Sequence, residues 1–210
     1  MRPTVLGLAL FTMTIAGFAQ DWELGGAVGY GWDLDSSVVD GASRVHSGQP
    51  ARGGFSVVLD ENPYKYLGGE FQYVFRDGGT QLKANGIVET TSGYSNIIVY
   101  NLMVHMTPYE SKFRPFVGVG AGIKIYTSSD VPLLQPLGRT AILTRGTQVE
   151  PVISFDGGLK FTVRRHTQLR LDLRVFASPT PDCLIRPIFQ SHIKGWIFDF
   201  MPMAGVAYVF

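Results

Sequence analysis

The chain of 210 residues has the length of a single domain, and its charges nearly cancel, with 18 Lys and Arg against 17 Asp and Glu. Without a basic excess it has no electrostatic means of holding a nucleic acid, and it carries no acidic tail. Cys183 is the single cysteine, so no disulfide can form within the chain. The 25 glycines and the 12% of aromatic residues are typical of an all-β protein with crowded strands.

Residues 1–20 differ in character from the rest of the chain. Arg2 supplies a positive charge, residues 5–15 are mainly apolar, and Gly17 and Ala19 place small side chains where a cleavage site requires them. The apolar stretch is too short to anchor the protein comfortably in a membrane as a helix. We therefore expect residues 1–20 to be a cleaved secretory signal peptide.

Residues 21–210, the expected mature domain, contain no apolar run long enough for a transmembrane helix. Instead, apolar and polar side chains alternate with the two-residue period of a β-strand. The eight predicted strands are residues 21–32, 53–59, 67–76, 96–106, 113–126, 148–163, 167–176 and 196–210. Long and short connections alternate between them. Residues 33–50, 127–147 and 177–193 are expected to be long loops, and residues 77–95 a polar excursion or a hairpin extension.

Two of these strands show the alternation most clearly. In residues 167–176, Leu169, Leu171 and Leu173 alternate with polar or charged neighbours, and residues 196–210 carry one aromatic, apolar face up to the last residue. An even number of strands joined by alternately long and short connections is typical of bacterial outer-membrane barrels. The sequence therefore predicts an all-β fold, an eight-stranded antiparallel up-and-down transmembrane β-barrel.

The bulky apolar face of the strands is expected to point outward, toward lipid. Eight strands leave an interior only wide enough for side chains to fill. Rows of Trp, Phe, Leu and Tyr would overfill it, whereas the opposite rows of small and charged residues would fit. The aromatic residues expected to face lipid are Trp22, Tyr30, Trp32, Phe71, Tyr73, Phe75, Tyr100, Phe155, Trp196 and Phe198. The charged residues expected in the lumen are Glu23, Glu70, Arg76, Arg114, Lys124, Glu150, Asp156, Lys160, Arg170, Asp172, Arg174 and Asp199.

These lumen charges balance, with six acidic and six basic residues. Paired and hydrogen-bonded charge is tolerated in an interior, whereas unpaired buried charge is costly. If the turn at 164–166 centres its hairpin, Asp156 lies near Arg174 and Lys160 lies diagonal to Asp172. The sequence therefore predicts a salt-bridged lumen rather than an open, ion-selective pore.

With the signal peptide, the alternating strands from Trp22 onward and the final Gly205-Val206-Ala207-Tyr208-Val209-Phe210, the chain resembles a known family. It is similar to the small outer-membrane β-barrels of Gram-negative bacteria, the OmpA- and OmpX-like eight-stranded barrels. The resemblance implies an integral outer-membrane location and contact with outer-membrane lipid and lipopolysaccharide. It also implies an insertion signal at Val206, Tyr208 and Phe210, read by the barrel-assembly machinery. Because the chain stops at Phe210, no peptidoglycan-binding domain and no cell-wall tethering are expected.

Few residues point to catalysis. The glycines of residues 118–122 superficially resemble a nucleotide-binding loop, but they lie in a strand that no helix follows, which excludes that motif. His46 beside Ser47, and His192 beside Ser191, leave open an outer-leaflet lipid-modifying enzyme. Such an enzyme needs the nucleophile and the base within hydrogen-bond reach, which a polar loop does not ensure. No catalytic residue is therefore predicted.

The remaining histidines and the cysteine have structural interpretations. His105 is expected to join the lumen network, His166 to lie in a periplasmic turn and Cys183 to be an incidental loop thiol. Their positions show no metal-ligand spacing, so neither a metal nor another cofactor is expected.

The sequence favours a non-enzymatic outer-membrane barrel, structural or interacting through its long external loops with an unidentified partner. A narrow, porin-like channel for small solutes is the alternative. A lipid A-modifying enzyme and a soluble lipocalin-like carrier with inverted faces are the remaining hypotheses. A ten-stranded barrel results if residues 80–95 or 138–147 contain additional crossings.

Overall fold

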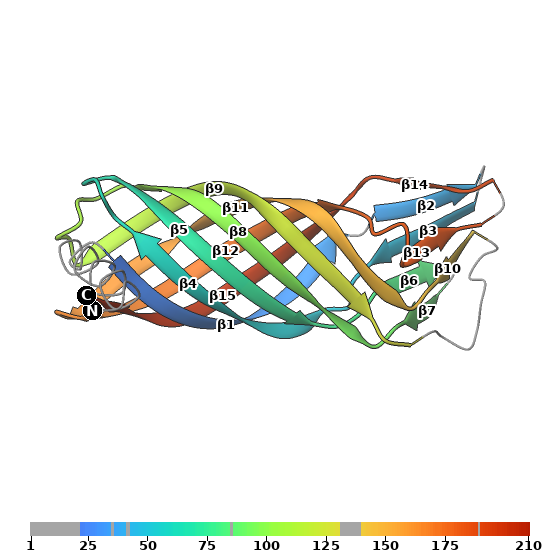
Figure 1. The fold of residues 1–210 in the computed structure, drawn as a ribbon, viewed down its shortest axis with the longest axis horizontal. Helices are drawn as coiled ribbons and strands as arrows, with labels where there is room; N and C mark the ends of the chain where they lie inside the picture. The colour runs from blue at the N-terminus through green and yellow to red at the C-terminus, as the bar shows by residue number, and fades with distance from the viewer. Residues whose placement is uncertain (1–21, 35, 41–42, 85, 131–139, 189) are drawn as a thin grey trace, which may run out of the picture.

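The computed structural model describes residues 22–34, 36–40, 43–84, 86–130, 140–188 and 190–210 (Figure 1). Eight antiparallel strands close into a barrel in the order β1-β15-β12-β11-β9-β8-β5-β4. These strands are β1 (Trp22–Leu34), β4 (Arg52–Glu61), β5 (Leu67–Asp77), β8 (Gly93–His105), β9 (Phe113–Ser128), β11 (Gly146–Arg164), β12 (Thr167–Pro179) and β15 (Trp196–Val209). The first and last strands pair from Glu23 opposite Val209 to Leu34 opposite Phe198, which closes the sheet.

The predicted eight-stranded antiparallel barrel is confirmed, and each predicted strand is present with somewhat different bounds. A ten-stranded barrel would have required additional crossings within residues 80–95 or 138–147. The strands at residues 81–84, 87–90 and 141–143 lie outside the barrel instead. The expected signal peptide, residues 1–20, lies outside the described residues. Within the described part of the chain, no helix has the length and apolar character needed to cross a membrane.

The two ends of the barrel are built differently. At one end, short turns connect the strands, and Phe210 N donates to Trp22 O at 3.1 Å, so the last strand finishes beside the first. At the other end, the chain between barrel strands forms two further sheets (Figure 1). One sheet has the order β14-β2-β3-β6-β7, made of β14 (His192–Lys194), β2 (Ser36–Asp40), β3 (Ser43–Gly48), β6 (Gln81–Ala84) and β7 (Ile87–Thr90). The other pairs β10 (Ala141–Leu143) with β13 (Ile185–Pro187).

We call these seven strands the cap. Its side chains form a hydrophobic core of their own, separate from the barrel: Val38, Val45, Leu82, Ala84, Ala141, Leu143 and Ile185, with Ile193 packed against them. The sequence predicts loops at residues 33–50, 127–147 and 177–193. That expectation is wrong where these stretches form the cap strands β2, β3, β10 and β13 and the start of β14. Each cap strand contributes only a few apolar residues, so the core appears only once several connections pack together.

Solvent exposure in the barrel is inverted relative to a soluble protein. Outward side chains are apolar and exposed, for example Val28 at 67% and Leu171 at 59%, whereas Glu70 and Arg76 are fully buried inside. This arrangement contradicts the soluble carrier hypothesis, in which the apolar face would point into the lumen. A closed barrel also pairs its backbone groups without water, as a bilayer requires.

Candidate functional site: the filled lumen and the outer cap

Inward-facing side chains fill the barrel in three layers along its axis. Strand β5 shows their order, since Glu70, Gln72, Val74 and Arg76 point inward successively from the short-turn end toward the cap. The layer nearest the short turns, which we call the lower ionic layer, contains Glu23, Asp60, Glu70, Arg114, Asp156, Lys160, Arg170, Asp172 and Arg174. The apolar layer contains Ala27, Val74, Ile97, Val99, Val152, Phe176, Met201 and Met203. The layer nearest the cap, which we call the upper ionic layer, contains Asp33, Arg76, Lys124 and Asp199.

Arg174 and Arg170 each pair with three carboxylates of the lower ionic layer. Arg174 Nη1 lies 2.6 Å from Glu70 Oε1 and 3.1 Å from Asp156 Oδ2. Its Nη2 lies 2.9 Å from Asp172 Oδ2. Arg170 is shared similarly, with Nη2 at 2.5 Å from Glu70 Oε2 and Nη1 at 2.8 Å from Asp60 Oδ2. The planar guanidinium suits this role because it presents several donors in fixed directions.

Lys160 and Arg114 extend this layer toward the short-turn end. Lys160 Nζ lies 2.7 Å from Glu23 Oε2 and 2.6 Å from Asp60 Oδ2. Arg114 Nη1 lies 3.4 Å from Glu23 Oε1, and its Nη2 donates to Asn62 Oδ1 at 3.3 Å. The partners come from β1, β4, β9 and β11, so the ion pairs tie strands together across the lumen.

The upper ionic layer also holds the chain that enters the cap. Arg76 pairs with both Asp33 and Asp199, and Lys124 pairs with Asp199. Arg76 Nη2 donates to the carbonyl of Pro50 at 3.0 Å. Asp33 Oδ2 accepts a hydrogen bond from the backbone N–H of Gln49 at 2.6 Å.

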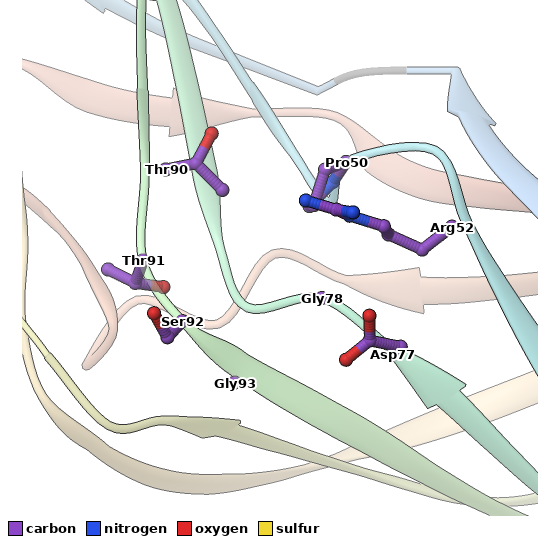
Figure 2. A pocket seen from close by; sticks show the side chains of 8 residues that line it. All are labelled: Pro50, Arg52, Asp77, Gly78, Thr90, Thr91, Ser92 and Gly93. Atoms are coloured by element: carbon purple, nitrogen blue, oxygen red, sulfur yellow. The ribbon is translucent and has the colours of Figure 1, made fainter.

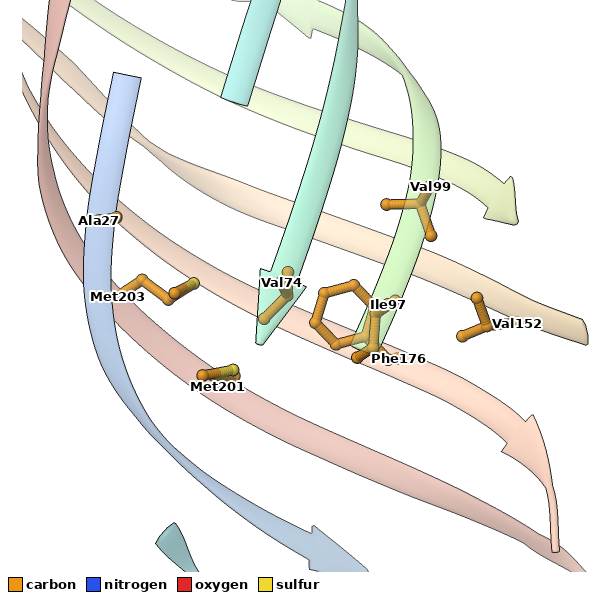
Figure 3. Packing of buried hydrophobic residues seen from close by; sticks show 8 residues of the cluster. All are labelled: Ala27, Val74, Ile97, Val99, Val152, Phe176, Met201 and Met203. Carbon is orange, nitrogen blue, oxygen red and sulfur yellow. The ribbon is translucent and has the colours of Figure 1, made fainter. Parts of the chain in front are cut away.

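Between the two ionic layers the lumen is mainly apolar, although the buried Ser56 and Ser154 stand opposite Val74 and Phe176. Figure 3 shows the side chains of the apolar layer, with Phe176, Met201 and Met203 among the larger ones. Phe176 and Ile97 are fully buried and Met201 is 1% exposed. Hydrophobic constrictions of this kind oppose the passage of water and ions.

The structure buries every residue expected in the lumen network except Glu150. Asp156 stands directly opposite Arg174, as the turn position predicts. Lys160 stands opposite Arg170 and so lies diagonal to Asp172, but its ion pairs are with Glu23 and Asp60.

Glu150 takes no part in the ion pairs of the described residues. It lies near the outer end of β11, only partly buried, and accepts a hydrogen bond from Gln148 Nε2 at 2.6 Å. His105 is buried in the lumen, 6.1 Å from the ring of Phe116, but neither ring nitrogen has a hydrogen-bond partner among the described residues. It therefore lies beside the network and is not bonded to it.

Sequence reasoning missed two lumen carboxylates, Asp33 and Asp60, and placed both in connections. In the structure Asp33 belongs to β1 and Asp60 to β4. The signal was present, since Asp33 is in phase with Glu23 and Asp60 is in phase with Ser56 on the inward rows. Extending the alternation by a few residues would have identified both.

The outward rows carry the aromatic residues expected to face lipid. Tyr30, Trp32, Phe71, Tyr100, Phe155, Trp196 and Phe198 are exposed, and Trp22, Tyr73 and Phe75 are partly buried. Several contact one another, such as Phe55 and Phe75 with ring centroids 5.4 Å apart. At the C-terminus, Val206, Tyr208 and Phe210 are all about half exposed on this exterior.

No described serine hydroxyl bonds to a histidine ring. His46 and His192 are exposed, and Ser191 Oγ lies 2.5 Å from the backbone carbonyl oxygens of both Thr140 and Ile188, which share its one hydroxyl proton. His166 lies in the turn between β11 and β12, where its Nδ1 is 2.8 Å from Val209 O. Among the described residues, no group of histidine, cysteine and acidic side chains could hold a metal ion.

Cys183 is a free, exposed thiol in the segment before β13. Desolvation and the neighbouring Asp182 carboxylate raise the pKa of this thiol, which keeps it protonated and weakly nucleophilic at neutral pH.

Comparison with known proteins identifies the fold. No protein-family model matches the chain, and no curated protein matches it in sequence. Among solved structures, Neisserial surface protein A matches 90% of this chain and 97% of its own at 10% identity and a TM-score of 0.59. The outer membrane protein OprG from Pseudomonas aeruginosa matches 90% and 95% at 12% identity and a TM-score of 0.56. The outer membrane protein AlkL, solved in lipid bilayers, matches 92% of each chain at 14% identity and a TM-score of 0.53.

At these identities the likeness is one of fold. The apolar exterior, the charged interior and the closed sheet independently require a bilayer around the barrel. The chain therefore has the fold of the small eight-stranded outer-membrane β-barrels, and it is an integral protein of the bacterial outer membrane.

Proposed function

We propose that this protein is a non-enzymatic, non-conducting outer-membrane barrel that holds the cap outside the cell as a folded binding surface. The observation that carries the proposal is the filled lumen. Ion pairs and the apolar layer occupy the interior, so a narrow channel has no continuous polar path. The cap, in contrast, has its own hydrophobic core and extends from the end of the barrel opposite the short turns.

The proposal orients the barrel with the short turns in the periplasm and the cap outside, as in outer-membrane barrels generally. In that orientation the exterior contacts outer-membrane lipid, and lipopolysaccharide surrounds the base of the cap. Val206, Tyr208 and Phe210 act as the insertion signal for the barrel-assembly machinery. Their exposed row of apolar side chains supports this role.

Cysteine labelling tests the orientation. Cys183 is exposed near the cap, so a membrane-impermeant maleimide at mildly alkaline pH is expected to label it in intact cells. The matched control is Arg165→Cys in a Cys183→Ser background, which moves the thiol to the short turn between β11 and β12. This control should react only after the outer membrane is permeabilised. The opposite pattern would overturn the orientation.

Planar-bilayer recording tests the closed lumen. The folded protein is expected to give no conductance steps above the lipid background, with a general porin as the positive control. Discrete steps that recur in independent preparations would show that the apolar layer does not close the barrel, and the channel alternative would then replace this proposal.

A further inference from the structure

A cavity of about 350 Å³ lies where the barrel rim meets the cap. It is formed by the start of β4, the end of β5 and the connection from β7 to β8 (Figure 2). Its volume is at the lower end of the range for small-ligand pockets, roughly 300–1,000 Å³. We call it the rim pocket, and its polar side chains are those of Arg52, Asp77, Thr90, Thr91 and Ser92.

The rim pocket contains one cation and one anion that do not neutralise each other. Arg52 and Asp77 are both exposed and both line the cavity. Within the described part of the chain, neither side chain forms an ion pair or a hydrogen bond. The lumen cations, by contrast, are all paired. Two unpartnered opposite charges in one cavity favour a ligand that carries both signs itself.

Two neighbouring residues add to this arrangement. Thr90 Oγ1 accepts a hydrogen bond from Gln81 Nε2 at 2.8 Å, so its own hydroxyl proton is available to a ligand. Gly78 has a positive φ of 105°, and a Cβ there would stand 2.8 Å from Pro50 Cγ and 3.2 Å from Arg52 Cγ. Glycine at this position therefore keeps open the space beside the Arg52 side chain.

Aromatic residues below the rim pocket place it relative to the bilayer. On the outer wall, Phe75 stacks between Phe55 and Tyr94, with ring centroids 5.4 and 5.7 Å away. Asp77 stands opposite Tyr94 and continues the outward row of Phe75. Aromatic girdles mark the boundary between the hydrocarbon and the headgroups. The rim pocket consequently opens at the level of lipid headgroups.

We propose that the rim pocket binds a phosphoethanolamine group. Arg52 and the Thr90 hydroxyl hold the phosphate oxygens, and Asp77 holds the ammonium. A ligand with phosphate alone would bring its negative charge close to the Asp77 carboxylate, which disfavours it. A phosphoethanolamine group could come from a lipid or from a free solute, and the binding test distinguishes the two sources. The inference rests on the rim and is independent of what the cap binds.

The test uses the folded protein in an uncharged maltoside detergent and isothermal titration calorimetry. The probes are short-chain phosphatidylethanolamine, short-chain phosphatidylglycerol, free phosphoethanolamine and inorganic phosphate. We expect phosphatidylethanolamine to bind more tightly than phosphatidylglycerol. Tighter binding of the lipid than of free phosphoethanolamine identifies a lipid as the source, and equal binding identifies the soluble group.

Three variants separate the two charges. Arg52→Gln should weaken phosphatidylethanolamine binding about tenfold, the size of one lost charge-assisted hydrogen bond. Asp77→Asn should remove the preference over phosphatidylglycerol. Arg44→Gln, at an exposed arginine of β3 in the cap, is the matched control and should bind like the wild type.

Gel mobility before and after boiling verifies that each variant is folded. The proposal is overturned if the wild type binds no phosphoethanolamine probe or prefers phosphatidylglycerol. It is also overturned if Arg52→Gln and Asp77→Asn behave like the Arg44→Gln control.

Discussion

The Arg174→Gln variant tests whether the lower ionic layer holds the barrel together. Arg174 is fully buried and bonds to Glu70, Asp156 and Asp172. After the substitution, Glu70 and Asp172 would still pair with Arg170, whose Nη2 lies 2.5 and 3.3 Å from their carboxylate oxygens. Asp156 has no other ion pair among the described residues. Removing one partner of a buried ion pair typically costs about 3–5 kcal/mol, because a buried charge is left uncompensated. We expect the free energy of unfolding to fall by about that amount.

Urea unfolding in lipid vesicles, followed by tryptophan fluorescence, measures this loss. Trp22, Trp32 and Trp196 all lie on the outer wall, so their emission reports release from lipid. Arg165→Gln, in the exposed turn between β11 and β12, removes the same charge without a lumen contact and should change stability by less than about 0.5 kcal/mol. A loss for Arg174→Gln no larger than that of this control would refute the ion-pair account of the lumen.

A second substitution isolates the uncompensated carboxylate. Asp156→Asn, added to Arg174→Gln, removes the charge that the first change leaves unpaired. The double variant should therefore be more stable than the sum of the two single losses predicts, with a coupling of about 0.5–3 kcal/mol for residues in one network. Strict additivity would mean that Asp156 and Arg174 do not depend on each other.

Three further substitutions probe the strand contact, the lipid face and the cap. Gly122→Ala places a Cβ against the carbonyl oxygen of Ile98, so folding yield by gel mobility should drop, whereas Gly53→Ala, with 3.8 Å of clearance, should fold normally. Leu171→Arg puts a charge on the lipid face and should cost up to about 2–4 kcal/mol in urea unfolding, the value at the bilayer midplane. An unchanged midpoint would argue against lipid at that position. Val45→Asp buries a charge in the cap core. Trypsin should then cut the cap, while the barrel should still change its gel mobility on boiling. A variant as resistant to trypsin as the wild type would contradict a packed cap core.

The barrel could be predicted from the sequence because lipid and lumen make opposite demands on successive residues. Leu169, Leu171 and Leu173 face lipid while Arg170 and Asp172 face the ionic layer, and this contrast is visible without a structure. The prediction was weakest at strand ends. Acidic residues near turns, such as those at 33 and 60, have a separate local preference for turns. Because of that preference, sequence reasoning assigns both residues to connections and not to the inward rows of β1 and β4.

The apolar layer and the cap could not be predicted, for a different reason. Val74 and Phe176 stand on inward rows whose nearest members are mainly polar or charged, and Met201 follows Asp199 on its row. Only the closed barrel brings these three residues together in one cluster. In the cap, Val38 and Leu82 come from different connections and pack in one core. Both features depend on contacts between distant segments, whereas local periodicity describes one strand at a time.

The upper ionic layer connects the filled lumen to the cap. Asp33 stands near the end of β1, just before the first long connection, and Gln49 and Pro50 stand just before β4, where that connection ends. Both ends are held by one cluster, because Asp33 accepts from the Gln49 N–H while Arg76 bonds to Asp33 and to the Pro50 carbonyl. The hairpin β2–β3 is therefore fixed to the barrel wall by charges buried in the lumen. A solute channel would need this space open, whereas a display scaffold gains a rigid base from filling it, since loops on a rigid scaffold commonly carry binding function.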